Sequence, residues 1–159
     1  MIQPVDGAPE PMQESDLAEI LALERRAYPY PWTEGILRDS LRAGYSCWVV
    51  RDADGHLRAY AFMSMAVGEA HILNLCVDPQ FQRQGLGRRV LGHLKSVAGA
   101  ASVQLMLLEV RKSNHAAIAL YLRSGFQRLG QRKNYYPADN GSEDAWLLSH
   151  ELPGQPVNT

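Results

Sequence analysis

Three apolar runs joined by very short connections constrain the fold of this chain more than any other feature. The runs are rich in aromatic and aliphatic residues, and they read YSCWVVR at 45–51, LRAYAFMSM at 57–65 and AHILNLCV at 70–77. Only DADGH and AVGE separate them. Aromatic and β-branched residues favour strands, and short glycine-containing connections favour hairpins. The three runs therefore predict an antiparallel meander.

A helix and a further strand are expected after the meander. The pattern changes at about Gly85 to apolar residues at helical spacing, from Leu86 to Ala98. The segment VQLMLLEVR at 103–111 is almost continuously apolar, which is typical of a strand covered on both faces. A helix between the strand ending at Val77 and the strand ending near Arg111 predicts a crossover connection.

Two helices are expected before the meander. Ser15 and Asp16, with Glu19 three residues after Asp16, predict a capped helix, and the prolines at 29 and 31 end it. Thr33 is expected to cap a second, short helix. Its apolar side and its stop signal are Ile36, Leu37, Leu41 and Gly44.

The last part of the sequence predicts a helix and two strands. Asn114 begins the helix and Gly125 ends it. The strand candidates are FQRLGQRKNYY and EDAWLLSHEL, joined by the turn-prone PADNGS. The expected fold class is therefore α/β (α+β), with a mixed, mostly antiparallel central sheet flanked by helices.

Length and composition favour one domain. The chain has 159 residues, of which 46% are hydrophobic, enough for one sizeable core but too few for two ordinary domains. We expect a single domain over residues 12–150, after a loosely held extension at 1–11 with at most a short strand. A flexible tail is expected at 151–159.

Charge and apolar patterning bear on partners and location. The net charge is −1 and the pI is near 6.5, so no global field favours nucleic acid or an anionic membrane. The acidic N-terminal stretch and the lack of a long apolar run predict a cytoplasmic protein. We expect a monomer that binds neither nucleic acid nor a membrane.

Cysteine and histidine spacing gives no sign of a metal site. Cys47 and Cys76 each lie inside an apolar run, so they are expected to be small buried side chains. The five histidines lack ligand spacing and are interpreted as solvent-facing or structural. We therefore expect no metal.

The segment CVDPQFQRQGLGRRVL is the most informative motif. Gln82, Gly85 and Gly87 lead from a strand into a helix, where unpaired N–H groups and the helix dipole favour a phosphate. A Walker loop would need Lys followed by Ser or Thr at the two positions held by arginines 88 and 89, and a dinucleotide fingerprint would need glycine at Val90. A glycine-containing helix start without a ligand remains an alternative.

This Q-x-x-G-x-G spacing after NLCVDP resembles the coenzyme A pyrophosphate loop of the GNAT acetyltransferase superfamily. The resemblance implies that the backbone of the preceding strand holds the pantetheine arm and polarises the thioester carbonyl. The implied acetyl-coenzyme A contacts in these segments are Leu75, Cys76, Val77, Gln82, Arg83, Gln84, Gly85, Leu86, Gly87 and Arg88. Arg83, Arg88 and Arg89 could assist the phosphates or could be a solvated helix start.

A second segment, LEVRKSNHAAIALYLRSGF at 108–126, contains residues suited to proton transfer. Acetyl transfer to an amine needs a base for the ammonium proton and an acid for the leaving thiolate. Glu109 in an apolar strand and Tyr121 two turns into a helix could supply them. A buried glutamate paired with an arginine and a core tyrosine are the structural alternatives.

Four separated motifs together are similar to the bacterial ribosomal-protein alanine acetyltransferases, called RimI. They are PWTE, GEAHILNLCVDP, LEVRKSNHAAIALYLRSGF and RKNYYPADNGSEDAWLL, spread over residues 12–150. The resemblance implies a GNAT fold that acetylates the N-terminal alanine of a small-subunit ribosomal protein. It implies these roles: Glu109 as general base, Tyr121 as general acid, Asn114 and Tyr121 as coenzyme contacts, and Tyr135, Tyr136 and Glu143 near the peptide.

Other acceptors and another class of function stay open at this point. Trp32 is expected to line a peptide groove because it lies in a proline-rich loop. The same fold could instead acetylate a lysine side chain or a small amine. A module that binds acyl-coenzyme A or assists ribosome assembly without catalysis is a third alternative, and the presence of both Glu109 and Tyr121 argues against it.

Overall fold

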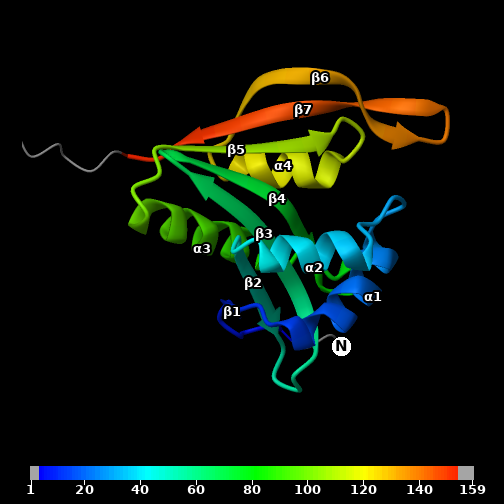
Figure 1. Ribbon diagram of the computed structural model, residues 1–159, viewed down its shortest axis with the longest axis vertical. Coiled ribbons are helices and arrows are strands. Elements are labelled where there is room, and N and C mark those ends of the chain that lie inside the picture. Colours follow the sequence, from blue (N-terminus) through cyan, green and yellow to red (C-terminus); the bar gives the residue numbers. More distant parts are fainter. Residues whose placement is uncertain (1–3, 154–159) are drawn as a thin grey trace, which may run out of the picture. The chain divides into compact units, whose positions relative to one another are not determined.

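The structure is a computed structural model that describes residues 4–153. Those residues form a mixed seven-stranded sheet and four α-helices, so the expected fold class is confirmed (Figure 1). The strand order is β1-β2-β3-β4-β5-β7-β6. In chain order the elements are β1 Glu10–Pro11, the 3-10 helix η1 Glu14–Asp16, α1 Leu17–Ala27, α2 Glu34–Arg42, β2 Ser46–Arg51, β3 Leu57–Ala66, β4 Glu69–Val77, the 3-10 helix η2 Pro79–Phe81, α3 Leu86–Ala100, β5 Leu105–Arg111, α4 His115–Arg123, β6 Gln127–Ala138 and β7 Gly141–Glu151.

The chain divides into two compact units. The first contains the chain up to Ser64 together with Leu73–Leu94. The second contains Met65–Ile72 and the chain from Lys95 onward. In the part of the chain that the structure describes, no helix is long and apolar enough to cross a membrane.

In the first unit, α1 and α2 follow the expected pattern with two differences. Leu17, Ile20 and Leu23 are buried on α1, and the Thr33 hydroxyl accepts the Ile36 N–H at 3.2 Å as the cap of α2. The expected Asp16–Glu19 cap is wrong, because the Asp16 carboxylate accepts from the Gln13 N–H at 2.8 Å instead and pairs with an arginine of β2. Ile36 is 46% exposed, so the predicted apolar side of α2 is narrower than expected.

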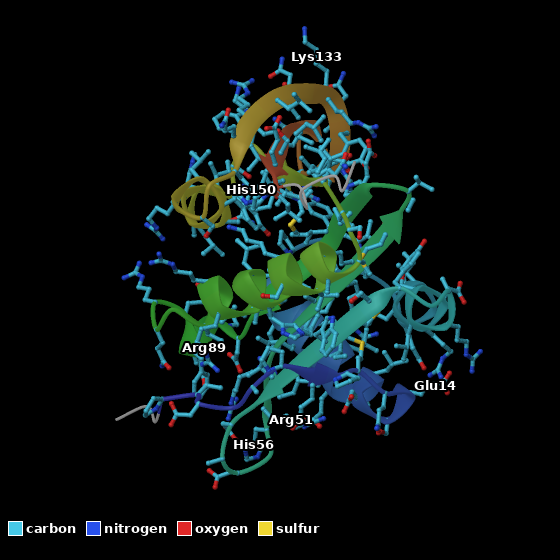
Figure 2. The ribbon with its side chains drawn as sticks, turned by 90° about the vertical axis from the view of Figure 1, so that its left-hand side faces the viewer. Glu14, Arg51, His56, Arg89, Lys133 and His150 are labelled. Carbon is cyan, nitrogen blue, oxygen red and sulfur yellow. The ribbon has the colours of Figure 1, made fainter. Side chains whose placement is uncertain are left out.

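The strands of the first unit confirm the start of the meander. β2 and β3 are antiparallel, with Cys47 opposite Phe62. Phe62 and Tyr60 are fully buried in the core of this unit. Arg51, labelled in Figure 2, lies at the end of β2. It pairs with Asp16 of η1 and Glu19 of α1, and these ion pairs connect the sheet to the helix.

The described residues before β1 contact the rest of the first unit. Val5 is buried, and the carbonyl groups of Val5 and Gly7 accept hydrogen bonds from the Arg89 guanidinium. A Cβ atom at Gly7 would lie 2.3 Å from the Arg51 carbonyl oxygen, so the two backbones touch where only glycine fits. The loose extension expected at 1–11 includes residues 1–3, which lie outside the described residues.

The second unit begins with the predicted crossover. β4 and β5 are parallel, paired from Glu69 opposite Leu105 to Ile72 opposite Leu108. β7 lies between β5 and β6 and is antiparallel to both. The tail expected at 151–159 overlaps this unit at its start, since Glu151 belongs to β7, while residues 154–159 lie outside the described range.

The helix α4 and the strand β5 place the side chains used below. The Asn114 side chain accepts the Ala117 N–H at 3.2 Å and caps α4, as expected. Along β5 the buried residues Met106, Leu108 and Val110 alternate with half-buried ones. No residue of this strand is exposed, which agrees with the expectation that both faces are covered, and Glu109 lies on the less buried face.

Candidate active site

The candidate coenzyme loop leaves the sheet of the first unit at a buried aspartate. Asp78 follows β4 and is 1% exposed. Its carboxylate accepts the Gln80 N–H at 3.1 Å and pairs with Arg26 and Arg58, both at 3.0 Å. Because two cations and an N–H group compensate this buried charge, the direction in which the chain leaves the strand is well defined.

The loop itself is open and ends at the start of α3. Residues 82–85 are exposed, and Arg83 and Gly85 have positive φ angles of 65° and 78°. A Cβ atom at Gly85 would meet no atom within 4 Å, so open space adjoins this backbone. Leu86 is 2% exposed, and its side chain therefore belongs to the core, which leaves only its backbone N–H for a ligand.

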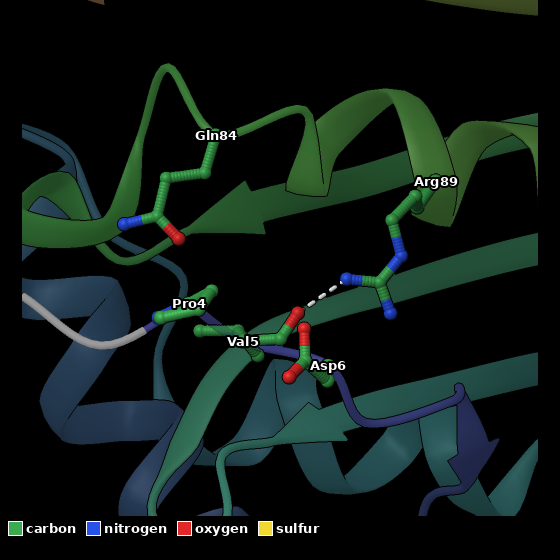
Figure 3. A pocket seen from close by; sticks show the side chains of 5 residues that line it. All are labelled: Pro4, Val5, Asp6, Gln84 and Arg89. Atoms are coloured by element: carbon green, nitrogen blue, oxygen red, sulfur yellow. Dashed lines mark hydrogen bonds between the residues drawn. The ribbon is translucent and has the colours of Figure 1, made fainter.

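A cavity of ≈ 640 Å³ lies between this loop and the N-terminal segment of the same unit (Figure 3). Pro4, Val5, Asp6, Gln84 and Arg89 line it. The Arg89 guanidinium, a candidate for phosphate binding from the sequence, donates instead to carbonyl groups of the N-terminal segment. The arginines 83 and 88 are exposed.

The last residues of β4 extend beyond the part of the strand that is paired with β5. The pairing of these strands stops at Ile72, whereas β4 continues to Val77. The Tyr28 hydroxyl donates to the Leu75 carbonyl at 2.8 Å. Cys76 is 2% exposed, and burial raises the pKa of its thiol to about 12. Its side chain is therefore an unreactive part of the core, as the sequence predicted.

A buried glutamate that sequence reasoning missed fixes the loop of Trp32. Glu24 on α1 is 2% exposed. Its carboxylate accepts from the Trp32 N–H at 2.8 Å, from the Asn74 side-chain amide at 2.9 Å and from the Tyr60 hydroxyl. The available signal was its spacing, because Glu24 lies four residues after Ile20 on the apolar side of the helix.

Trp32, which is predicted to line a peptide groove, packs partly against the core. Its ring is half-buried and lies 5.5 Å from the Phe62 ring, against the core of the first unit. The loop that carries it is exposed on both sides, at Pro31 and Thr33.

Glu109 is the centre of a cluster in the second unit. Its side chain is 11% exposed, and Oε2 accepts from the Tyr135 hydroxyl at 2.9 Å. His71 Nε2 lies 3.7 Å from Oε2, and Arg132 Nε lies 3.8 Å from Oε1. The sequence predicted neither the histidine nor the arginine here, because β4 and β6 meet this carboxylate only through tertiary structure.

The predicted peptide-side residues Tyr135, Tyr136 and Glu143 gather around this cluster. The two tyrosine rings are 4.9 Å apart, nearly perpendicular, and Arg111 stacks 4.5 Å from the Tyr136 ring. The hydrogen bond to Glu109 raises the pKa of Tyr135, and burial raises that of Tyr136 to about 12. Hydrogen bonding from Ser113, followed by that from Arg111, lowers the pKa of Glu143.

Two further predicted residues belong to the same unit: Asn114 caps α4, and Tyr121 lies within it. Tyr121 is 7% exposed, and its ring lies 5.8 Å from that of Phe126. The Oδ1 atom of Asn114 is used in capping the helix. Both positions are compatible with a structural role as well as with the role that the resemblance implies.

One group of the described residues has ligand atoms close enough for a cation. The atoms of Asp52, Asp54 and His56 lie within 4.8 Å of one another in the β2–β3 turn, and this candidate site is empty. Asp52 already accepts from the backbone N–H groups of Asp54 and His56 and from Arg58. These bonds account for the carboxylate as part of the turn.

Comparison with known proteins decides the family. The model of the acetyltransferase (GNAT) family matches residues 17–126, a stretch that includes the loop at Gly85, Glu109 and Tyr121. The chain belongs to the GNAT acetyltransferase family.

Several GNAT relatives resemble the chain over nearly its whole length. The [ribosomal protein bS18]-alanine N-acetyltransferase of Escherichia coli K12 is 38% identical over 138 residues, which cover 87% of this chain and 93% of the relative. A putative enzyme of the same name from Bacillus subtilis is 33% identical, with 86% and 90% covered. The crystal structure of the Escherichia coli ribosomal-protein-S18-alanine N-acetyltransferase has a TM-score of 0.88 at 35% identity and covers 96% of this chain and 98% of that one.

Proposed function

We propose that this acetyltransferase uses acetyl-coenzyme A to acetylate the α-amine of the N-terminal alanine of ribosomal protein bS18. The relatives from Escherichia coli and Bacillus subtilis carry this acceptor in their names. The observation in this chain that supports the proposal most is Glu109, a largely shielded carboxylate that accepts a hydrogen bond from Tyr135, one of the predicted peptide-side tyrosines. Residues 12–150 form the catalytic domain in this proposal.

Glu109 acts as the general base. An α-amine has a pKa of ~7.7–8.0 against ~10.4 for lysine, so a single carboxylate can remove its proton at neutral pH, directly or through one water. Oε2 already accepts a hydrogen bond from the Tyr135 hydroxyl at 2.9 Å, while Arg132 Nε lies 3.8 Å from Oε1. Oε1 therefore has the larger remaining capacity and takes the proton.

Tyr121 acts as the general acid. When bound, acetyl-coenzyme A supplies the acetyl group as an activated thioester. The phenol of Tyr121 gives its proton to the leaving sulfur, and its 7% exposure shields this transfer from water. Tyr121→Phe keeps the ring packing and removes only the hydroxyl, so it should lower turnover by ~10²–10⁴-fold with unchanged folding. Full turnover in that variant would make Tyr121 a core residue only.

The loop at 82–88 holds the pyrophosphate of the coenzyme. Support comes from the open space at Gly85 and from the 15-residue helix α3, because a helix leaves its first-turn N–H groups without intrahelical partners. Asn114 and the backbone of Leu75–Val77 contact the pantetheine arm in this proposal. Saturation at ~100 times the dissociation constant should stabilise the protein by ~2.7 kcal/mol. Gly85→Val should weaken binding, because a β-branched residue is strained at this φ of 78°.

The acceptor is tested with two peptides. One begins with the alanine of bS18, and the other is the same peptide with a blocked N-terminus and an internal lysine. We expect acetylation of the first only, with the product located on the α-amine by mass spectrometry. Faster acetylation of the blocked lysine peptide would assign the enzyme to side-chain amines instead.

A further inference from the structure

The strand β6 contains an irregularity directly beside Glu109. Arg132 is paired with Ala145 of β7, and Tyr136 is paired with Glu143. Three residues of β6, 133–135, therefore lie opposite the single residue Asp144. Such a bulge bends the strand and redirects side chains. The side chain of Lys133 extends away from the ribbon at this bend (Figure 2).

A carboxylate fixes the middle of the bulge. Asn134 has a φ of 55°, a left-handed conformation that asparagine tolerates better than most residues. Its N–H donates to Asp144 Oδ1 at 2.9 Å, and its side-chain oxygen accepts from the Ser142 hydroxyl at 2.9 Å. The backbone of Asp144 is fixed in turn, because its carbonyl accepts the Lys112 N–H at 3.1 Å.

The bulge determines where Tyr135 lies. This tyrosine is 43% exposed, so burial alone does little to position it. Its backbone follows directly after Asn134, and its hydroxyl reaches Glu109 Oε2 at 2.9 Å. A change in the bulge would therefore move the hydroxyl that orients the carboxylate.

We propose that Asp144 is a positioning residue for acetyl transfer: it fixes the left-handed turn at Asn134 and thereby holds the Tyr135 hydroxyl on Glu109. Asp144 acts through two other residues and touches no reacting atom. The proposal rests on the proposed function only where it concerns turnover, since the geometry of the bulge does not depend on the acceptor.

The first test follows the phenol of Tyr135 without any substrate. The ionisable groups near this hydroxyl are Glu109, Arg132 and His71, and the hydrogen bond to Glu109 raises the pKa of the phenol. In a titration followed by NMR of the assigned ring carbon, Asp144→Ala should move this pKa back toward ~10. Asp144→Asn keeps an oxygen acceptor and should retain the wild-type value. Lys133→Ala is the matched control, because it alters the bulge without touching its hydrogen bonds.

The second test measures coupling in turnover. Asp144→Ala should lower kcat for the alanine peptide by up to ~100-fold, the scale of an active-site group displaced by about 1 Å, with little change in the KM for acetyl-coenzyme A. In a Tyr135→Phe background the same change should have almost no further effect. Equal losses in both backgrounds would overturn the route through Tyr135, as would an unchanged Tyr135 titration in Asp144→Ala. If the Tyr135 pKa shifts in Asp144→Ala while Glu109→Gln keeps full activity, the positioning role of Asp144 is supported and Glu109 is removed from the proposed function.

Discussion

Glu24 and Glu109 are two glutamates that each accept a hydrogen bond from a tyrosine, yet their surroundings differ. Glu24, in the first unit, is 2% exposed and accepts from a hydroxyl, a side-chain amide and a backbone N–H. Glu109, in the second unit, accepts from one hydroxyl, and the nearest side-chain nitrogens of His71 and Arg132 lie 3.7 and 3.8 Å from its carboxylate oxygens. A carboxylate has about four acceptor sites. Most acceptor sites of Glu24 are occupied by hydrogen bonds within the fold, whereas Glu109 has unoccupied acceptor sites that can take a proton.

The largest effect is expected from Glu109→Gln. An amide cannot take the ammonium proton, so turnover on the alanine peptide should fall by ~10²–10⁴-fold. The unfolding free energy should change little, because only one hydrogen bond, from the exposed Tyr135, is affected. Steady-state kinetics between pH 6 and 9, beside a thermal melt, measures both. A variant with the wild-type pH profile would show that the free capacity of this carboxylate is not used in catalysis.

Glu24→Gln should produce the opposite pattern. The glutamine NH₂ group would face buried donors, and each donor left unpaired costs ~1–3 kcal/mol. With about 3 kcal/mol lost in a chain of this length, the melting temperature should drop by roughly 6–12 °C. Turnover below the melting range should change far less than in Glu109→Gln. A stable variant would contradict the structural role assigned to Glu24.

A matched pair of hydroxyl deletions sharpens the comparison. Tyr60→Phe removes a fully buried donor to Glu24 and should cost ~1–2 kcal/mol in urea unfolding. Tyr135→Phe removes an exposed donor to Glu109 and should leave stability within ~0.5 kcal/mol while lowering kcat. Equal losses of stability in both variants would mean that the hydrogen bonds to Glu24 and to Glu109 contribute equally to folding.

The smallest effect concerns acid stability through Glu143. Its pKa is lowered in the folded protein, so its contribution is present above the unfolded pKa and is lost as the pH falls through the folded value. Wild type should therefore lose stability relative to Glu143→Gln on acidification below about pH 4.3. Urea titrations at a series of pH values measure this difference. A constant difference between pH 7 and pH 3 would show that the hydrogen bonds from Ser113 and Arg111 to this carboxylate contribute nothing to stability.

The elements of this fold were predictable where their signals are local. The caps at Thr33 and Asn114, the meander and the crossover strand follow from caps, turns and apolar runs, and all are found. The position of β7 between β5 and β6 was not predicted, because strand order depends on contacts far apart in the sequence.

In the candidate site too, side chains were predicted from local signals but not from contacts between distant parts of the sequence. Glu109 was identified because a charge in an apolar strand is visible in the sequence. Its neighbours His71 and Arg132 come from other strands, and the left-handed Asn134 leaves no clear local signal. Arg89 illustrates the converse, since its sequence position favours phosphate while its guanidinium is bonded to the N-terminal segment.

The contact between Gly7 and Arg51 has a consequence for tolerance to substitution. Any side chain at position 7 would begin 2.3 Å from a backbone oxygen that cannot rotate away, so even alanine must displace the segment from β2. The carbonyl groups bonded to Arg89 would move with it. Gly7 lies outside residues 17–126, the stretch that the family model matches. A saturation mutagenesis survey of this chain should therefore find a position intolerant of substitution outside the stretch that the family model matches.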